Sequence, residues 1–313
     1  MSIKVIEPRP ITGDRLVSSN APIDTIPEYD PNAAYSPGAN GAQGDRVVEG
    51  TEIYEAVAEV TGVLPSEGEQ QEPKKWILVG SLNQWAVFNG IIGDPTESGE
   101  PMPVHGGNGL QFVIRPGRVV NALALLGIEG ANEVRVEVIS GDDVVYDTTR
   151  SLRSTVGINS YYAYFFEPVE QDTDAVFTGL PSYNADIRVT VPAQVDVVRC
   201  GLCVVGRMRD LGLLYWGFST GIMSFSRRVR DEFGRVRLLK RDNAKLASFE
   251  VSVDGNRSNA LARYLAKWDS EPLLWIGVEQ YEPTIIYGFY EDWRLVYPHL
   301  HFHNCTLDIV GLT

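Results

Sequence analysis

Two short stretches, VRVEV at residues 134–138 and IRVTV at residues 187–191, decide the fold class. In each stretch apolar and polar side chains alternate strictly, and this period of two is the pattern of a strand with one buried face and one face in water. Several strands of this kind at this spacing are typical of an antiparallel β-sandwich. We therefore expect residues 93–205 to form a β-sandwich domain and the protein as a whole to be mainly β.

Three further segments surround this domain. Residues 1–33 contain five prolines, which fix the backbone and remove hydrogen-bond donors, so we expect an extended N-terminal arm. Residues 34–92 alternate short apolar runs with glycine-rich turns, which predicts a small β module. Residues 206–313 are expected to form a β-rich C-terminal domain with one helix near residues 258–268, where apolar side chains recur at helical spacing.

Length and composition exclude several classes of protein. The chain has 313 residues, of which 44% are hydrophobic, so it can bury a core and is not disordered throughout. Three cysteines are too few for a disulfide-rich secreted scaffold. The beginning, MSIKVIEP, lacks the apolar stretch of a secretory signal, and the most apolar run, residues 211–225, is shorter than the roughly 20 residues of a membrane span. We expect synthesis in the cytoplasm and no membrane span.

The net charge of −14 is unevenly distributed along the chain. It divides into −10 for residues 1–100, −5 for residues 101–200 and +1 for residues 201–313. A protein with this acidic balance is a poor candidate for a general nucleic-acid binder. The difference between the two ends instead favours contacts between the acidic part of one copy and the basic part of the next.

One segment, residues 227–245, is basic, with eight basic and three acidic side chains. Six of the eight are arginines, whose planar guanidinium suits pairing with carboxylates at interfaces. We predict that this segment contacts an acidic face of a neighbouring copy; a solvated strand–turn–strand and a nucleic-acid contact are the alternatives. The arginines that we assign to the subunit interface are Arg227, Arg228, Arg230, Arg235 and Arg237.

The strongest metal-binding pattern is HLHFHNC at residues 299–305, because alternate residues of a strand share one face. The first and third histidines would lie roughly 13 Å apart in a straight strand, so one zinc ion could not bind all three. CGLC at residues 200–203 could add thiolates, but inside an apolar run it is more typical of small buried cysteines. We predict no metal and no cofactor, with His301, His303 and Cys305 as weak candidates.

Motifs of enzymes are absent from the sequence. It contains no Gly-x-Ser-x-Gly elbow, no phosphate-binding Walker loop and no dinucleotide-binding fingerprint. Carboxylates that are adjacent in sequence, as at residues 291–292, do not place two acids across a cleft as glycoside hydrolysis requires. We predict that the protein is not an enzyme; the alternative is a glycan depolymerase or a zinc-dependent hydrolase.

The β module also contains a family-like pattern. It has a tyrosine at 35, GDRV at 44–47, YEA at 54–56, TGVLP at 61–65 and a closing tryptophan at 76. This order resembles small chitin-binding-type carbohydrate modules. Its continuation, NQWAVF at 83–88, together with FSRR at 225–228, LWIG at 274–277 and YGFY at 287–290, is similar to tail and baseplate proteins of tailed bacteriophages.

The resemblance implies a structural virion protein of a phage tail or baseplate, made in the host bacterial cytoplasm and present in several copies. Its expected partners are copies of itself and other tail proteins. The module implies a further role in attachment to host cell-surface glycan, for which aromatic rings could stack on sugars. The candidate glycan-binding residues are Tyr54, Trp76 and Trp85. That the module serves only as a structural spacer is the alternative.

Overall fold

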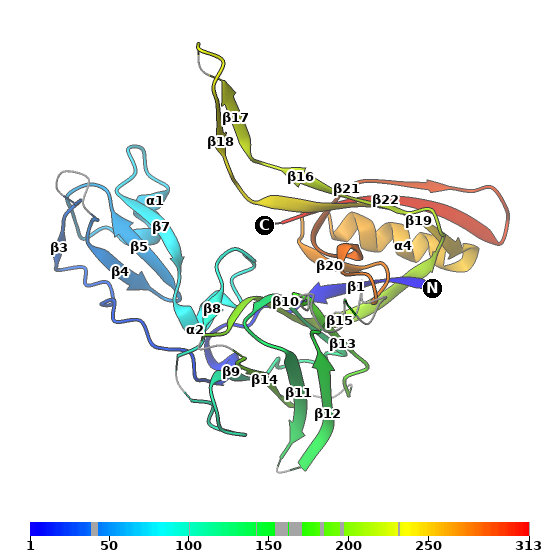
Figure 1. Cartoon of the computed structure of the whole chain (residues 1–313), viewed down its shortest axis with the longest axis horizontal. Helices are drawn as coiled ribbons and strands as arrows, with labels where there is room; N and C mark the ends of the chain where they lie inside the picture. The colour runs from blue at the N-terminus through cyan, green and yellow to red at the C-terminus, as the bar shows by residue number, and fades with distance from the viewer. Residues whose placement is uncertain are drawn as a thin grey trace.

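The computed structural model describes residues 1–38, 43–99, 101–141, 143–153, 162, 171–181, 185–194, 197–230 and 232–312. It is mainly β with antiparallel sheets, which confirms the fold class that the alternating stretches predict. Figure 1 shows a small module at one side, a sandwich in the lower part and a barrel with the long helix on the other side. No helix in the described ranges has the length and apolar character needed to cross a membrane.

The sandwich has a five-stranded sheet, in the order β12–β11–β14–β9–β2, that packs on the strands β13, β10 and the first half of β15. VRVEV lies in β11 and IRVTV in β14, and Val136 is opposite Val189 in the antiparallel pair. The alternate valines and isoleucines of both stretches are buried in one core. The strands are β2 (Leu16–Ser19), β8 (Thr96–Glu97), β9 (Gly109–Ile114), β10 (Ala122–Glu129), β11 (Glu133–Ser140), β12 (Asp143–Ser151), β13 (Ala175–Thr178), β14 (Asp186–Pro192) and β15 (Arg199–Leu214).

Six strands close into an antiparallel barrel in the order β15–β1–β20–β21–β22–β19. The barrel closes where Leu213 and Leu214 of β15 pair with Ser252 and Val251 of β19. Closure removes the unpaired strand edges that an open sheet would present to other chains. The remaining strands are β1 (Ser2–Pro8), β19 (Asn243–Asp254), β20 (Leu273–Ile276), β21 (Ile285–Val296) and β22 (Phe302–Gly311).

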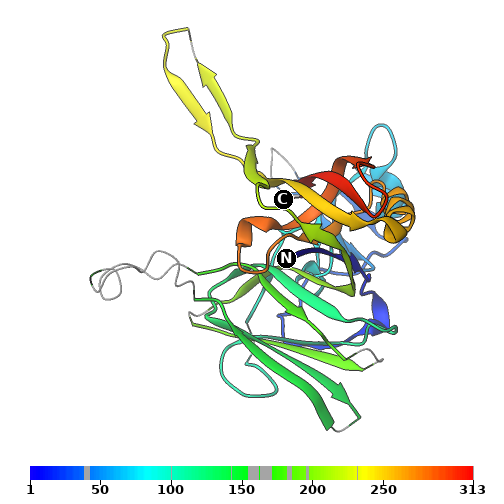
Figure 2. The same ribbon diagram turned by 90° about the vertical axis from the view of Figure 1, so that its right-hand side faces the viewer.

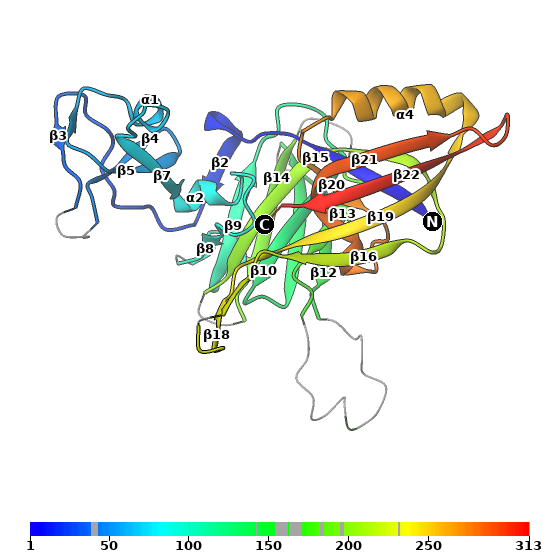
Figure 3. The same ribbon diagram turned by 90° about the horizontal axis from the view of Figure 1, so that it is seen from above.

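The predicted helix is α4, which spans Gly255–Lys267 and packs against the barrel. Leu261, Leu265 and the following Trp268 are buried in the barrel core. The helix begins three residues earlier than its apolar spacing indicates, because the Asp254 carboxylate accepts a hydrogen bond of 2.9 Å from the Asn256 backbone amide and caps it. Figure 3 shows α4 lying along one side of the barrel strands.

Residues 1–33 do not form an extended arm. Residues 2–8 are β1, which pairs with β15 on one side and with β20 on the other. β2 continues the five-stranded sheet of the sandwich by pairing with β9, after the short 3-10 helix η1 (Gly13–Arg15). The prolines lie at the end of β1 and in the loops after the strands, where they do not prevent strand pairing. The predicted arm is therefore part of both the barrel and the sandwich.

The predicted boundary near residue 205 falls inside β15, which belongs to both large domains. The face of β10 and β15 that turns away from the sandwich packs on the outside of the barrel, where Leu202, Val204, Leu274 and Tyr287 share a core. These strands are buried on both faces, which explains their continuous apolar runs. At Gly206 a side chain would collide with the Glu7 carbonyl of β1, so glycine permits the close approach of the two strands.

The small module has a three-stranded sheet, β4–β5–β7, and a two-stranded sheet, β3–β6. Its core contains Val47, Tyr54, Ala56, Val60 and Trp76. The module ends earlier than residue 92, because Trp85 and Phe88 pack on the sandwich core. The elements are β3 (Ala34–Tyr35), β4 (Arg46–Glu49), β5 (Glu52–Ala56), β6 (Val60–Thr61), α1 (Pro65–Glu69), β7 (Trp76–Ser81) and, outside the module, α2 (Asn83–Ala86).

A two-stranded ribbon, residues 225–241, projects from the barrel (Figures 1 and 2). β16 (Ser219–Ser224) pairs with β19 at the edge of the barrel, and beyond it the chain continues as β17 (Arg227–Arg230) and β18 (Val236–Leu239). These two strands pair with each other in a sheet of their own. The remaining 3-10 helix, η3 (Glu282–Thr284), leads into β21.

Candidate assembly interface

The ribbon places all five predicted interface arginines on one projecting element. Arg227, Arg228 and Arg230 lie on β17, Arg237 lies on β18, and Arg235 lies in the turn that joins the two strands. Every residue of both strands is exposed to solvent. The antiparallel register sets Arg228 opposite Leu238 and Arg230 opposite Val236. The structure thus brings the five predicted arginines together on one element; that they form a subunit interface stays a prediction.

Both faces of the ribbon carry the same kinds of side chain. Residues opposite one another in an antiparallel pair point to the same side, and successive residues of a strand point to opposite sides. Each face therefore presents two arginines and two aliphatic side chains. One face has Arg227, Val229, Arg237 and Leu239, and the other has Arg228, Arg230, Val236 and Leu238.

A ribbon with this composition is incomplete on its own. An isolated pair of strands is marginally stable in water, and exposed apolar side chains in a row are typical of protein–protein contacts. Leu238 is 73% exposed and Phe233, in the turn, is 87% exposed. Neither face is the polar face of an ordinary surface hairpin. The arrangement suits insertion between two surfaces, or into a groove, of another polypeptide.

Four arginines of the ribbon carry charge that the described residues leave uncompensated. Arg227, Arg228, Arg230 and Arg237 form no ion pair with any residue that the structure describes. Asp231, which belongs to the predicted segment, lies outside the described residues. The ribbon has seven basic and two acidic side chains in its sequence. It is therefore a cationic and apolar element that suits an acidic partner.

Lys245 was predicted to belong to the same basic cluster, but the structure separates it from the ribbon. Its Nζ lies 2.7 Å from the Asp174 carboxylate and 3.6 Å from that of Glu282, at the junction of barrel and sandwich. Burial raises the pKa of Asp174, and Lys245 acts in the opposite direction. Lys245 thus compensates a buried acid and offers no free charge to a partner.

The small module presents the opposite charge. Residues 34–82 contain eight acidic and three basic side chains. Asp45, Glu52 and Glu59 are among them. Figure 1 shows the module at the far side of the molecule from α4, and the view from above in Figure 3 shows it away from β18 of the ribbon. One molecule therefore carries an acidic body and a basic projection at two different places. This separation is the geometry that a head-to-tail contact between copies requires.

Two of the three candidate glycan-binding aromatics are core residues. Trp76 is 0% exposed and Tyr54 is 3% exposed, and a buried ring cannot stack on a sugar. Trp85 is partly buried and packs edge-on against Phe88, on the sandwich side of the module boundary. These three side chains do not form a shared aromatic platform. They stabilise two different cores instead.

Sequence reasoning missed the aromatic contact that Tyr29 makes with the module. The Tyr29 ring stacks on Tyr35 at a centroid distance of 5.7 Å, and the rings of Tyr35 and Trp76 pack edge-on with their centroids 5.2 Å apart. Burial is the main cause that raises the pKa of the Tyr29 hydroxyl, and the nearby Tyr35 raises it further. Tyr29 comes from the segment that we expected to be an arm, so only the fold shows that it closes the module core.

The weak metal candidates do not come together as a site. His301 is exposed and precedes β22, whereas His303 and Cys305 lie inside β22 and are buried. The Tyr297 ring covers His303 at 4.5 Å, and Cys305 belongs to the barrel core, away from Cys200 and Cys203 in the sandwich core. Within the described ranges no group of three or more His, Cys, Asp or Glu side chains could hold a metal ion.

The buried thiols are also poor nucleophiles. Burial raises the pKa of Cys200 to about 12 and that of Cys305 to about 11, because an apolar core disfavours the thiolate. The Cys-x2-Cys motif is therefore a pair of core residues, as the apolar run around it indicates.

Comparisons with known proteins found no relative. No protein-family model matches the sequence, and no curated protein or solved structure is significantly similar to it. The features that bear on function are therefore the ribbon, the separation of acidic and basic charge, and the resemblance of the sequence motifs to phage tail proteins.

Proposed function

We propose that the chain is a structural virion protein of a bacteriophage tail or baseplate, which assembles with copies of itself and with other tail proteins through the ribbon. The observation that carries the proposal is the composition of the ribbon, with two arginines and two aliphatic side chains on each exposed face. The resemblance of the sequence to tail proteins supports the same role. The proposed role involves no catalytic step.

The proposed partner surface is the acidic module of a neighbouring copy. Burial of an exposed Leu or Phe side chain contributes roughly 1.5–3 kcal/mol, so Leu238 and Phe233 could supply much of a micromolar affinity. The arginines add charge-assisted hydrogen bonds to carboxylates and guide the encounter of the two copies. Host-surface glycan attachment remains outside this proposal, because Tyr54 and Trp76 are buried.

Analytical ultracentrifugation of the full chain tests the proposal. We expect concentration-dependent association between about 1 and 100 µM in low salt, which weakens as salt screens the arginine–carboxylate pairs. The double variant Arg228→Glu, Arg230→Glu should remain monomeric, because both changes reverse charge on one exposed face. A matched control is Arg263→Glu, an exposed arginine of α4 that is far from the ribbon.

Thermal melting checks that the double variant is still folded, because it should unfold at the same temperature as the wild type. A wild type that stays monomeric up to 100 µM would overturn self-assembly through the ribbon. Association of the double variant with unchanged affinity would assign the interface to another surface.

A further inference from the structure

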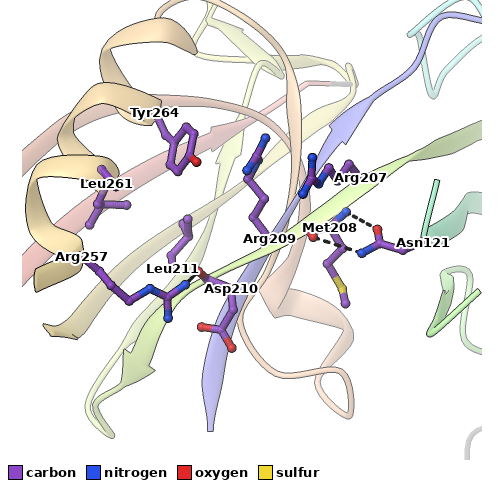
Figure 4. A pocket seen from close by; sticks show the side chains of 10 residues that line it. Asn121, Arg207, Met208, Arg209, Asp210, Leu211, Arg257, Leu261 and Tyr264 are labelled. Carbon is purple, nitrogen blue, oxygen red and sulfur yellow. Dashed lines mark hydrogen bonds between the residues drawn. The ribbon is translucent and has the colours of Figure 1, made fainter. Parts of the chain in front are cut away.

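A second feature, on the opposite side of the molecule from the assembly ribbon, is a cavity of about 280 Å³ between β15 and α4. Three arginines line it: Arg207 and Arg209 from the strand and Arg257 from the helix. Figure 4 shows their side chains around the opening, with Leu211 and Leu261 on its apolar side. Pockets that combine an apolar wall with a few converging polar groups are typical binding sites for small molecules.

The strand holds its two arginines in fixed positions. Arg207 and Arg209 are alternate residues of β15, so they project from the same side. Between them, the backbone amide of Met208 donates a hydrogen bond of 2.6 Å to the Asn121 side chain, which donates one of 3.3 Å to the Met208 carbonyl (Figure 4). This clamp fixes the backbone from which both guanidinium groups extend.

Arg209 is oriented by aromatic and ionic contacts but retains an unused donor. Its guanidinium lies 4.5 Å from the centre of the Tyr264 ring, and one of its terminal nitrogens lies 3.7 Å from the Glu7 carboxylate. Glu7 is bound more tightly by Lys267, at 2.5 Å. The Arg209 Nε is buried and has no hydrogen-bond partner among the described residues. A buried donor without a partner costs stability unless a ligand or water binds it.

The other two arginines have still more free donors. Arg257 donates one hydrogen bond, of 3.1 Å, to the Asp210 carbonyl. Arg207 forms no hydrogen bond or ion pair with the part of the chain that the structure describes. A guanidinium has five N–H donors and no acceptor, so three arginines against the one carboxylate among the described lining residues, that of Asp210, leave the cavity with an excess of donors and of positive charge. Only an anion, which accepts hydrogen bonds and carries negative charge, matches both the excess of donors and the positive charge.

We propose that this cavity binds an oxyanion, the carboxylate or phosphate group of a small molecule. Arg207 and Arg257 grip the anion from the two sides of the opening, and Arg209, held against Tyr264, forms the inner contact. The apolar side chains of Leu211 and Leu261 lower the local dielectric constant and strengthen each contact. The site is independent of the ribbon and of the proposed assembly.

Isothermal titration calorimetry with the full chain tests the site, with citrate and inorganic phosphate as separate probes in 100 mM NaCl. We expect one saturable site with a Kd below about 1 mM for at least one probe. Binding of citrate alone assigns a carboxylate ligand, and binding of phosphate alone assigns a phosphate ligand. Arg207→Gln and Arg257→Gln should each weaken binding about tenfold or more, because each removes a charge-assisted contact.

The matched control is Arg263→Gln, an exposed arginine of the same helix that does not line the cavity, and its affinity should equal that of the wild type. Both lining variants keep a polar, uncharged side chain in place of the guanidinium, and circular dichroism verifies that they fold. The ribbon variant Arg228→Glu, Arg230→Glu should bind the probe normally, so failure of assembly and failure of this site are distinguishable. No binding of either probe below 10 mM, or equal weakening by Arg263→Gln, would overturn the proposal.

Discussion

Replacing Trp76 with alanine should unfold the small module and leave the rest of the protein folded. Trp76 is the largest side chain of a core in which four other residues are buried, among those that the structure describes. Its indole N–H donates a hydrogen bond of 3.2 Å to the Val63 carbonyl, and its ring contacts Tyr35 and Tyr29. Gly68 lies so close to the indole that any side chain there would collide with it. The whole module is therefore arranged around this one residue.

The magnitude follows from the size of the module. Removal of a fully buried Trp side chain costs about 3–5 kcal/mol, and loss of its hydrogen bond adds about 1 kcal/mol. A folded unit of about 50 residues has a total stability of about 2.5–7.5 kcal/mol, at roughly 0.05–0.15 kcal/mol per residue. The loss is thus comparable with the whole stability of the module. The cores of the sandwich and the barrel share no residue with it.

Hydrogen exchange followed by mass spectrometry measures this effect segment by segment. In Trp76→Ala we expect β5 and β7 to lose protection, whereas β21 and β22 keep it. Trp216, which is 70% exposed, provides the matched control, and Trp216→Ala should change the free energy of unfolding by less than about 0.5 kcal/mol. Unchanged protection of β5 and β7 in the Trp76 variant would refute the reasoning. Equal loss of protection in β21 and β22 would show that the module is not an independent unit.

Three further predictions concern the barrel and the cysteines. Deletion of residues 1–8 removes β1 from between β15 and β20, so circular dichroism should show loss of the cooperative melting transition; a wild-type transition would contradict this. Lys267 lowers the pKa of Glu7, so the stability from this pair is present above the ordinary Glu pKa of about 4.3 and is lost as the pH falls through the lowered value. Acidification from pH 5 to pH 3 should therefore lower the free energy of unfolding of the wild type more than that of Glu7→Gln. The difference should be no more than about 1 kcal/mol, because Lys267 is largely exposed. Equal losses of unfolding free energy in the two proteins would exclude the linkage. The three cysteines are buried with raised thiol pKa values, so a thiol reagent should label them only after denaturation, and rapid labelling of the native protein would contradict their burial.

The parts of the fold that depend on local pattern could be predicted from the sequence. The alternation at residues 134–138 and 187–191 places two sandwich strands, and the helical spacing near residues 258–268 places α4. Local pattern could not place β1, because its partners lie about 200 residues or more away in sequence and the prolines at its end and beyond suggest an arm. Nor could it show that β15 continues from one domain into the next, because strand pairing decides where a domain ends.

The two candidate sites differ in the same way. The ribbon is continuous in sequence, so its arginines are visible there as a cluster. That its two faces carry the same kinds of side chain is known only from the strand register, which sets Arg228 opposite Leu238. The cavity combines alternate residues of β15 with Arg257, about 50 positions later, and no pattern in the sequence links them. Burial of Trp76 and Tyr54 was equally inaccessible, because an aromatic residue in a small module serves a core or a surface equally well.

The position of β1 in the barrel has a consequence for how the protein folds. β1 is made before every other strand of the barrel, yet Ser2 pairs with Leu213 and Lys4 pairs with Ile276. Contacts between residues so distant in sequence are slow to form, because a long loop must close before they add any stability. The barrel can close only after β22 has left the ribosome, while the small module can fold as soon as its own residues emerge. Until then the two edges that β1 will cover stay open to other chains, so yield in the cell should depend on synthesis rate and on chaperones.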